Sequence, residues 1–177
     1  MTIVEFFELS VGKWLSQRSS HRTDSQQTQG GKSELQFEML SSDHPDIAAL
    51  CAQHDIDPTL VGCSAKIAWT GTTDHSTKKI TGVTMIVSVP DAAKASEGMV
   101  ICQPTLPSSA PVVGRYAIGR DDVLTFTRET KTTFTEERLW FASPNLRLRT
   151  SLVSQGNGLM TTSFYSEIRF GGAKPTS

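Results

Sequence analysis

Alternating apolar and polar residues recur along most of the chain in short runs, with turn-forming residues between them. In the clearest run, GCSAKIAWT, the residues Cys63, Ala65, Ile67 and Trp69 fall on one face of an extended strand. Nine other segments also read as strands: residues 12–23, 34–40, 78–89, 98–106, 111–118, 121–130, 134–142, 145–154 and 159–170. About ten short strands at this spacing are typical of an all-β sandwich or barrel.

Two segments have helical periodicity instead. Residues 2–10 (TIVEFFELS) predict a short helix with one apolar stripe, formed by Val4, Phe7 and Val11 with Phe6 and Leu9 beside it. A second helix of about three turns is predicted between the second and third strands. Ser42 or Asp43 can cap this helix and Pro45 suits its first turn. Its apolar face consists of Ile47, Leu50 and Cys51.

The order of the strands favours a closed barrel. Consecutive strands with short connections indicate an up-and-down antiparallel meander, and closure removes exposed edges. The polar segment 24–33 is expected to be a loop, and Gly12-Lys13-Trp14 has the Gly-x-Trp pattern that opens lipocalin-like barrels. We therefore expect an all-β fold with minor α content, an antiparallel lipocalin-like barrel similar to fatty-acid-binding proteins. It forms a single domain over residues 1–170, with a flexible tail at 171–177 and room for one ligand.

Composition narrows the classes of function. The 177 residues carry a formal net charge of −1, which points to neither nucleic acid nor a membrane as partner. The chain begins without the basic start and apolar run of a signal peptide, and no apolar stretch approaches the roughly 20 residues of a membrane span. Three cysteines without framework spacing and four scattered histidines argue against a disulfide scaffold and a metal site. We expect a reduced, soluble protein of a cytosol-like compartment.

The stretch NLRLRTS contains the main candidate site. Arg147, Arg149 and Ser151 share one strand face, and the leucines lean to the other. Either the leucines face the core and the arginines face water, which is the default, or the arginines point inward. Buried guanidinium groups lose their hydration, so inward arginines require an anion or a wet pocket mouth. Their planar forks suit carboxylates.

The first strand and two tryptophans pose the same choice. Arg18 shares a face with Trp14, so a Trp14 that plugs the closed end of the barrel would bring Arg18 inside; otherwise Arg18 reaches water. Trp69 and Trp140 are either core residues or an aromatic wall for a flat conjugated ligand. Three inward arginines together would suit a ligand with two carboxylates.

The register of the hairpin TEERLWFASPNLRLRTS decides which side chains face inward. A two-residue loop would place Trp140 opposite Arg149. A three-residue loop with a left-handed Asn145 would shift the pairing by one residue, which turns every side chain of one strand to the other face. The pattern alone leaves Glu136 and Glu137 open as the inward carboxylate.

Motifs in order along nearly the whole chain resemble the S-type phycobiliprotein lyases, the CpcS/CpeS family of bilin lyases. FFELSVGKWLSQRSSH, HDIDP, the Trp69 strand, ERLWFASPNLRLRTS and SFYSEIRF carry this resemblance, and the arginine-containing motif is the most specific. The resemblance implies a barrel that binds a phycobilin non-covalently. Phycocyanobilin or phycoerythrobilin would be its substrate, with no prosthetic group. The bilin would be attached by a thioether to a cysteine of an apo-phycobiliprotein alpha or beta subunit.

The resemblance also implies roles for particular residues. The ligand-binding set would be Arg18, Trp69, Glu137, Trp140, Arg147, Arg149 and Ser151. An inward Glu137 favours the three-residue loop, and Glu137 with Arg18 would form the catalytic pair, because a carboxylate beside the pyrrole nitrogens holds their proton. The acceptor's cysteine supplies the nucleophile, so none of the chain's own cysteines need act, and Cys63 is expected in the core. His75 stands about where many members have a second tryptophan.

Two other functions compete with the lyase: a non-catalytic lipocalin-like carrier of a tetrapyrrole or fatty acid, and a purely structural assembly factor. A fatty acid has one carboxylate and needs fewer than three arginines. The leucines beside Arg147 and Arg149 suggest a homodimer or a heterodimer with a paralogous lyase. Removal of either arginine is expected to weaken binding with little effect on stability. The resemblance places the protein in the cytoplasm of a cyanobacterium or the plastid stroma of an alga.

Overall fold

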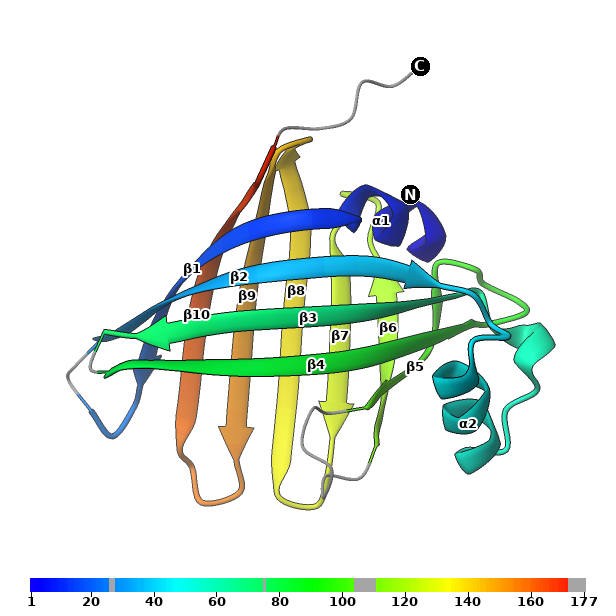
Figure 1. Cartoon of the computed structure of the whole chain (residues 1–177). Coiled ribbons are helices and arrows are strands. Elements are labelled where there is room, and N and C mark those ends of the chain that lie inside the picture. The colour runs from blue at the N-terminus through cyan, green and yellow to red at the C-terminus, as the bar shows by residue number, and fades with distance from the viewer. Residues whose placement is uncertain (26–27, 75, 104–110, 172–177) are drawn as a thin grey trace.

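The computed structural model is a closed antiparallel barrel with one helix at an end and another outside (Figure 1). It describes residues 1–25, 28–74, 76–103 and 111–171. His75 and most of the predicted tail, 172–177, lie outside these residues. The strands are β1 (Gly12–Arg22), β2 (Thr28–Leu40), β3 (Cys63–Thr73), β4 (Ser76–Pro90), β5 (Glu97–Gln103), β6 (Val112–Ile118), β7 (Leu124–Glu129), β8 (Thr133–Ser143), β9 (Leu146–Gln155) and β10 (Met160–Arg169).

Each strand pairs with its neighbours in sequence, and β1 also pairs with β10 to close the barrel. This order confirms the predicted up-and-down meander and the predicted set of ten strands. No helix in the described parts of the chain is long and apolar enough to cross a membrane.

Strand β2 begins earlier than predicted. The segment 24–33 was assigned to a loop, but residues from Thr28 onward pair with β1, with Gly31 opposite Arg18. Most side chains of this stretch are exposed or half-buried. A strand end in a polar environment lacks the apolar alternation that reveals a strand, and its glycines imitate a turn.

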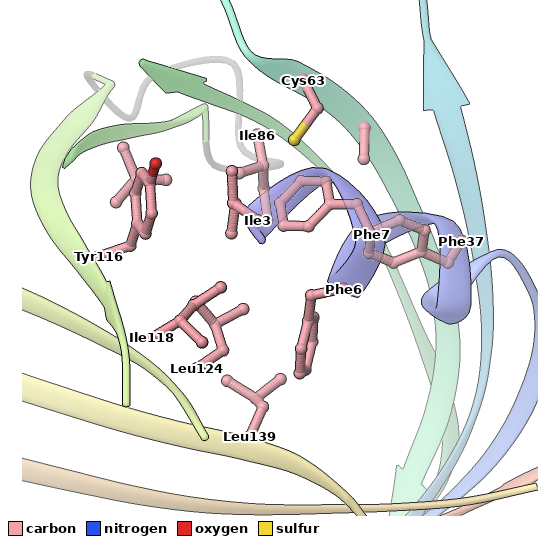
Figure 2. Packing of buried hydrophobic residues seen from close by; sticks show 12 residues of the cluster. Ile3, Phe6, Phe7, Phe37, Cys63, Ile86, Tyr116, Ile118, Leu124 and Leu139 are labelled. Carbon is pink, nitrogen blue, oxygen red and sulfur yellow. The ribbon is translucent and has the colours of Figure 1, made fainter. Parts of the chain in front are cut away.

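Helix α1 (Ile3–Ser10) closes one end of the barrel. Thr2 and Glu5 form a capping box at its start. Its buried side chains pack with residues from β2 to β8 in the main core cluster, as Figure 2 shows for Phe7 and Phe37, whose rings lie 5.4 Å apart. At its other end, Arg169 of β10 donates hydrogen bonds to backbone carbonyls of the helix terminus. The helix is therefore fixed by apolar packing and by a cation at its C-terminus.

The buried stripe of α1 differs from the predicted one. It consists of Ile3, Phe6, Phe7 and Ser10, which follow the spacing i, i+3, i+4 and i+7. Val11 was predicted on the stripe and Leu9 beside it, but these side chains are 40% and 45% exposed. Val11 lies beyond the last helical turn as the C-cap, so it cannot extend the helical face.

Helix α2 (Pro45–Gln53) packs outside the barrel. Its predicted apolar face is confirmed, since Ile47, Leu50 and Cys51 are buried against Val87 of β4 and Ile101 of β5. The predicted cap is wrong. His44, directly before Pro45, is the N-cap, and its side chain accepts a hydrogen bond from the backbone N–H of Asp46. A short 3-10 helix, η1 (Pro58–Leu60), follows.

Candidate functional site

The part of the barrel interior that α1 leaves open contains a cavity of about 430 Å³. This volume falls within the roughly 300–1,000 Å³ range of small-molecule sites. Phe6 and Ser10 of α1 contribute to its lining together with apolar side chains of the surrounding strands, among them Leu35, Ile67 and Trp69. The polar part of the lining includes Arg18, Arg128, Glu137, Arg147, Arg149, Tyr165 and Glu167. An apolar wall with convergent charged groups is typical of a binding site for an amphipathic ligand.

The β8–β9 hairpin has the register that places Glu137 inside. Glu137 pairs with Ser151, and Leu139 pairs with Arg149. Glu136 faces the other way, because adjacent strand residues alternate. The predicted choice of Glu137 over Glu136 as the inward carboxylate is confirmed at the level of orientation.

The turn that produces this register is not the predicted one. Ser143 pairs with Leu146, so the turn has two residues, and a register shift between Phe141 and Ser143 accommodates Ala142 as an extra residue. Among the described residues other than glycine, only two have a positive φ, and Asn145 is not one of them. A β-bulge at Ala142 therefore produces the register that was predicted to come from a three-residue loop with a left-handed Asn145. Either feature adds one residue to the hairpin and so shifts the pairing by one.

Five predicted residues come together at the cavity: Arg18, Trp69, Glu137, Arg147 and Arg149. Trp14 lies four residues before Arg18 on β1 and is buried at the α1 end of the barrel. Because residues an even number apart share a strand face, Arg18 also points into the barrel. The indole Nε1 of Trp14 donates a hydrogen bond of 2.8 Å to the carbonyl of Ser10. The predicted inward orientation of Arg18 is confirmed.

Trp140 and Ser151 do not line the cavity. Trp140 stands between Leu139 and Phe141, both of which pack in the interior, so alternation places Trp140 on the outer face. Its predicted place in an aromatic wall is wrong for this reason. Ser151 shares the inward face of Glu137, its partner across the hairpin, but lies beyond the lining residues.

Arg147 is held in a buried ion pair that the sequence did not reveal. Its Nε lies 2.6 Å from Oε2 of Glu167, and its Nη1 donates a hydrogen bond of 2.8 Å to the Ser10 hydroxyl. Ser10 in turn donates to the carbonyl of Phe6. The guanidinium also lies 4.9 Å from the ring centroid of Trp14. Burial lowers the pKa of Arg147, and the charge of Glu167 opposes that shift.

Glu167 is the main residue that the sequence analysis missed. Its side chain is 1% exposed, and it pairs with Arg147 across β9 and β10. The alternation within SFYSEIRF places Tyr165 and Glu167 on one strand face, so this motif contained the necessary pattern. The register that aligns Glu167 with Arg147 depends on the turn between β9 and β10, which is distant from both residues. The alternation of the strand residues does not specify this register.

Arg149 occupies a looser arrangement. Its Nη1 is 3.9 Å from Glu137 and its Nε is 3.9 Å from Glu167, while its guanidinium lies 3.7 Å from the ring centroid of Tyr165. Arg128 approaches Glu137 at 3.9 Å from the other side. Burial alone would lower the pKa of Arg149, but the two carboxylates raise it overall. These ion-pair distances of 3.9 Å exceed the length of a hydrogen bond, so the arginines and glutamates attract one another without direct hydrogen bonds at these contacts.

Two guanidinium nitrogens in the lining are left without acceptors. Nε of Arg18 and Nε of Arg149 are buried and have no hydrogen-bond partner among the described residues. An unsatisfied charged donor is costly to bury. The charged residues of the lining are four arginines, Lys32 and two glutamates, which together carry a formal charge of +3. The site is therefore suited to an anionic ligand.

Cys102 also lines the cavity, but as a thiol. Burial raises its pKa to about 11, which exceeds the opposing effect of Arg128. Burial likewise raises the pKa of Cys63 to about 11, and this residue belongs to the core cluster as predicted. Thiolates are the reactive form of cysteine, so neither residue is activated as a nucleophile. Among the described residues, no group of His, Cys, Asp or Glu could hold a metal ion.

Comparisons with known proteins agree over the whole chain. A family model described as "CpeS-like protein" matches residues 2–170. "Chromophore lyase CpcS/CpeS" of Thermosynechococcus vestitus is 44% identical over 177 residues, covering 100% of this chain and 97% of the relative. "Phycocyanobilin lyase subunit CpcS" of Picosynechococcus sp. is 36% identical over 167 residues, covering 93% and 84% of the two chains.

A solved structure is also similar. The S-type phycobiliprotein lyase CPES from Guillardia theta superposes with a TM-score of 0.85 at 28% identity, covering 97% of this chain and 94% of the other. The likeness extends over the complete barrel, including the strands that line the cavity.

Proposed function

We propose that this chain, which belongs to the CpeS-like protein family, holds a phycobilin non-covalently inside its barrel. It is a chromophore lyase that attaches the phycobilin to a phycobiliprotein. The observation that carries the proposal is that Nε of Arg18 and Nε of Arg149 have no hydrogen-bond acceptor in a cavity with excess positive charge. A linear tetrapyrrole carries two propionates, which would satisfy both donors through charge-assisted hydrogen bonds. Trp69 and the apolar lining would contact its flat, largely apolar surface.

The arginines would divide the work of binding. Arg18 and Arg149 have donors free for propionates, whereas Nε and Nη1 of Arg147 are engaged with Glu167 and Ser10. Arg147 would therefore act on the ligand chiefly through the positive charge of its guanidinium group, which lines the cavity. Ser151, on the same inward face as Glu137, would contact the bilin only if the ligand extends beyond the lining residues.

Glu137 and Arg18 are the proposed catalytic pair. The acceptor thiol adds across the exocyclic double bond of the bilin: a carbon–sulfur bond forms, the π bond breaks, and the thiol proton is transferred to the tetrapyrrole, so no oxidant or reductant is needed. A carboxylate beside the pyrrole nitrogens stabilises the protonated, more electrophilic chromophore. Glu137 faces the cavity between Arg128 and Arg149, which hold it in place.

Positioning would supply most of the rate enhancement. The lyase contributes no nucleophile, since its cavity thiol is protonated, and the acceptor's cysteine must reach a bilin held in one conformer. The proposed bilin is phycocyanobilin or phycoerythrobilin. The proposed acceptor is the alpha or beta subunit of a phycobiliprotein.

Mixing the purified protein with each bilin, before and after addition of an apo-phycobiliprotein subunit, tests the proposal. Absorption spectra should show binding first and then a shift to the spectrum of the chromophorylated subunit, with the pigment covalently bound to the subunit. Binding without transfer would indicate a carrier, and neither binding nor transfer would indicate an assembly factor. Either result would contradict the proposed function.

Association with a second copy is a further part of the proposal. The outer face of β1 and β10 exposes Leu15, Phe164 and Ile168, with Phe170 just beyond, at 45%, 45%, 56% and 64%. A second copy of the chain would cover this surface with an equally apolar one. Light scattering should give the mass of a dimer, and Leu15→Glu with Ile168→Glu should give a monomer that still binds bilin. A wild-type monomer would contradict this part alone.

A further inference from the structure

A glycine on β4 stands directly against the indole of Trp69. Gly82 pairs with Trp69 across the adjacent strands β3 and β4 (Figure 1). A Cβ atom built at Gly82 would lie 2.4 Å from Cε2 and 2.5 Å from Nε1 of Trp69. Because real Cβ atoms do not approach other heavy atoms so closely, the indole occupies space that any other residue at position 82 would fill.

The backbone itself does not require glycine at this position. Among the described glycines, those with a left-handed φ are Gly12, Gly158 and Gly171. Gly82 lies within the 15-residue strand β4, with an ordinary backbone. A glycine inside a strand weakens the strand and commonly marks a place where another group approaches closely. Here the approaching group is the Trp69 side chain.

The lining of the cavity shows the same arrangement. Ile80, Thr84 and Ile86 alternate along β4 and line the cavity, whereas Gly82, between them on the same face, does not. Gly82 is nevertheless buried. Trp69 covers it, so the indole lies along the barrel wall in the gap that the missing side chain leaves.

We infer that Gly82 is a positioning residue of the bilin site, which seats the Trp69 indole against the wall and keeps the lumen open for a linear tetrapyrrole. The inference rests on the proposed function and deepens it. A methyl group at position 82 would force the nearest indole atom from 2.4 Å to at least 3.4 Å, the onset of ordinary contact. The strands confine the ring on the wall side, so it would move into the space of the ligand.

The first test needs no ligand. Protein labelled with 5-fluorotryptophan should give one fluorine resonance for each of its three tryptophans, and Trp69→Leu identifies the one that belongs to Trp69. Gly82→Ala should shift that resonance and leave the others nearly unchanged. Gly156→Ala is the matched control, because a Cβ there would meet only Thr132, at 3.6 Å. An unchanged Trp69 resonance in Gly82→Ala would overturn the inference.

The second test measures phycocyanobilin affinity in two backgrounds. Gly82→Ala should weaken binding roughly tenfold or more, as expected for overpacking at a contact surface. In the Trp69→Leu background the same substitution should change affinity less than about twofold, because the colliding ring is gone. An equal loss in both backgrounds, or no loss in the wild-type background, would overturn the inference.

Failure of Gly82→Ala to fold would still decide the matter. The double variant Trp69→Leu/Gly82→Ala should then fold like Trp69→Leu, because the collision is relieved. If the double variant also fails, the strand needs glycine for another reason and the inference is wrong. Absence of bilin binding by the wild-type protein would defeat the proposed function, while the fluorine measurement would still report on the seat of Trp69.

Discussion

Replacement of Arg147 by alanine should destabilise the fold strongly, contrary to the small effect predicted from sequence. Arg147 and Glu167 form a buried ion pair with an Nε–Oε2 distance of 2.6 Å, and Glu167 is 1% exposed. Removing one partner of such a pair typically costs about 3–5 kcal/mol, because the other charge stays buried and uncompensated. Arg149 remains 3.9 Å from Glu167 and the Ser16 hydroxyl 3.5 Å, so we expect the lower end, about 3 kcal/mol.

Urea unfolding followed by circular dichroism measures this cost. With a slope of about 2 kcal/mol/M, the midpoint should fall by about 1.5 M at an unchanged slope. Arg149→Ala is the matched control: its ion-pair distances are 3.9 Å and its side chain is 24% exposed, so its loss should cost about 1 kcal/mol or less. Replacing both buried partners, as in Arg147→Met/Glu167→Leu, should restore most of the stability.

Two results would refute this reasoning. Arg147→Ala could leave the midpoint within experimental error of the wild type, which would mean that the ion pair is not formed in solution. Alternatively, Arg149→Ala could cost as much as Arg147→Ala, which would mean that the two arginines share Glu167 equally.

Three other predictions concern the site. Glu137→Gln should shift the absorption of the bound bilin and slow its transfer, while Glu136→Gln, on the outer face, stays near wild type; the reverse result would mean that the register is wrong by one residue. Burial raises the pKa of the Cys63 and Cys102 thiols from 9.0 to about 11, so the free energy of unfolding should fall as pH rises through this interval, because the unfolded chain releases these protons first; a wild-type profile that falls no more steeply than that of the Cys63→Ala/Cys102→Ala variant would contradict it. Denaturing electrophoresis with zinc fluorescence should show no pigment on this chain after incubation with bilin, since no described cysteine has a lowered thiol pKa; a persistent fluorescent band would defeat non-covalent binding.

The arrangement of the strands was largely predictable because the period-two pattern and the short connections agree with one another. The run from Cys63 to Trp69 shows this, since its predicted inward face is the observed one. The start of β2 was not predictable, because polar residues and two glycines at a strand end resemble a loop. The stripe of α1 was misassigned because Val11 falls beyond the helix, and helix ends depend on capping and tertiary contacts.

The site was predictable only as far as side-chain direction follows from alternation. Arg18, Trp69 and Arg149 face the cavity as predicted. The pairing of Arg147 with Glu167 depends on the register between β9 and β10, which no local pattern determines. Trp140 shows the converse error: a large aromatic beside a turn suggested a ligand wall, but its neighbours on β8 fill the interior and leave it outside.

Titration of phycocyanobilin against wild-type protein, Arg18→Ala, Arg149→Ala and the double variant, followed by visible absorption, tests the central claim most directly. Both side chains have a buried Nε without an acceptor, so each loss should weaken binding by about 1.5–3 kcal/mol, roughly tenfold to a hundredfold, if it removes a charged hydrogen bond to a propionate. The double variant should lose both contributions while its urea midpoint stays near the wild type. Wild-type affinity in the double variant would mean that the bilin is not held by this pair of arginines, and the proposed site would be wrong.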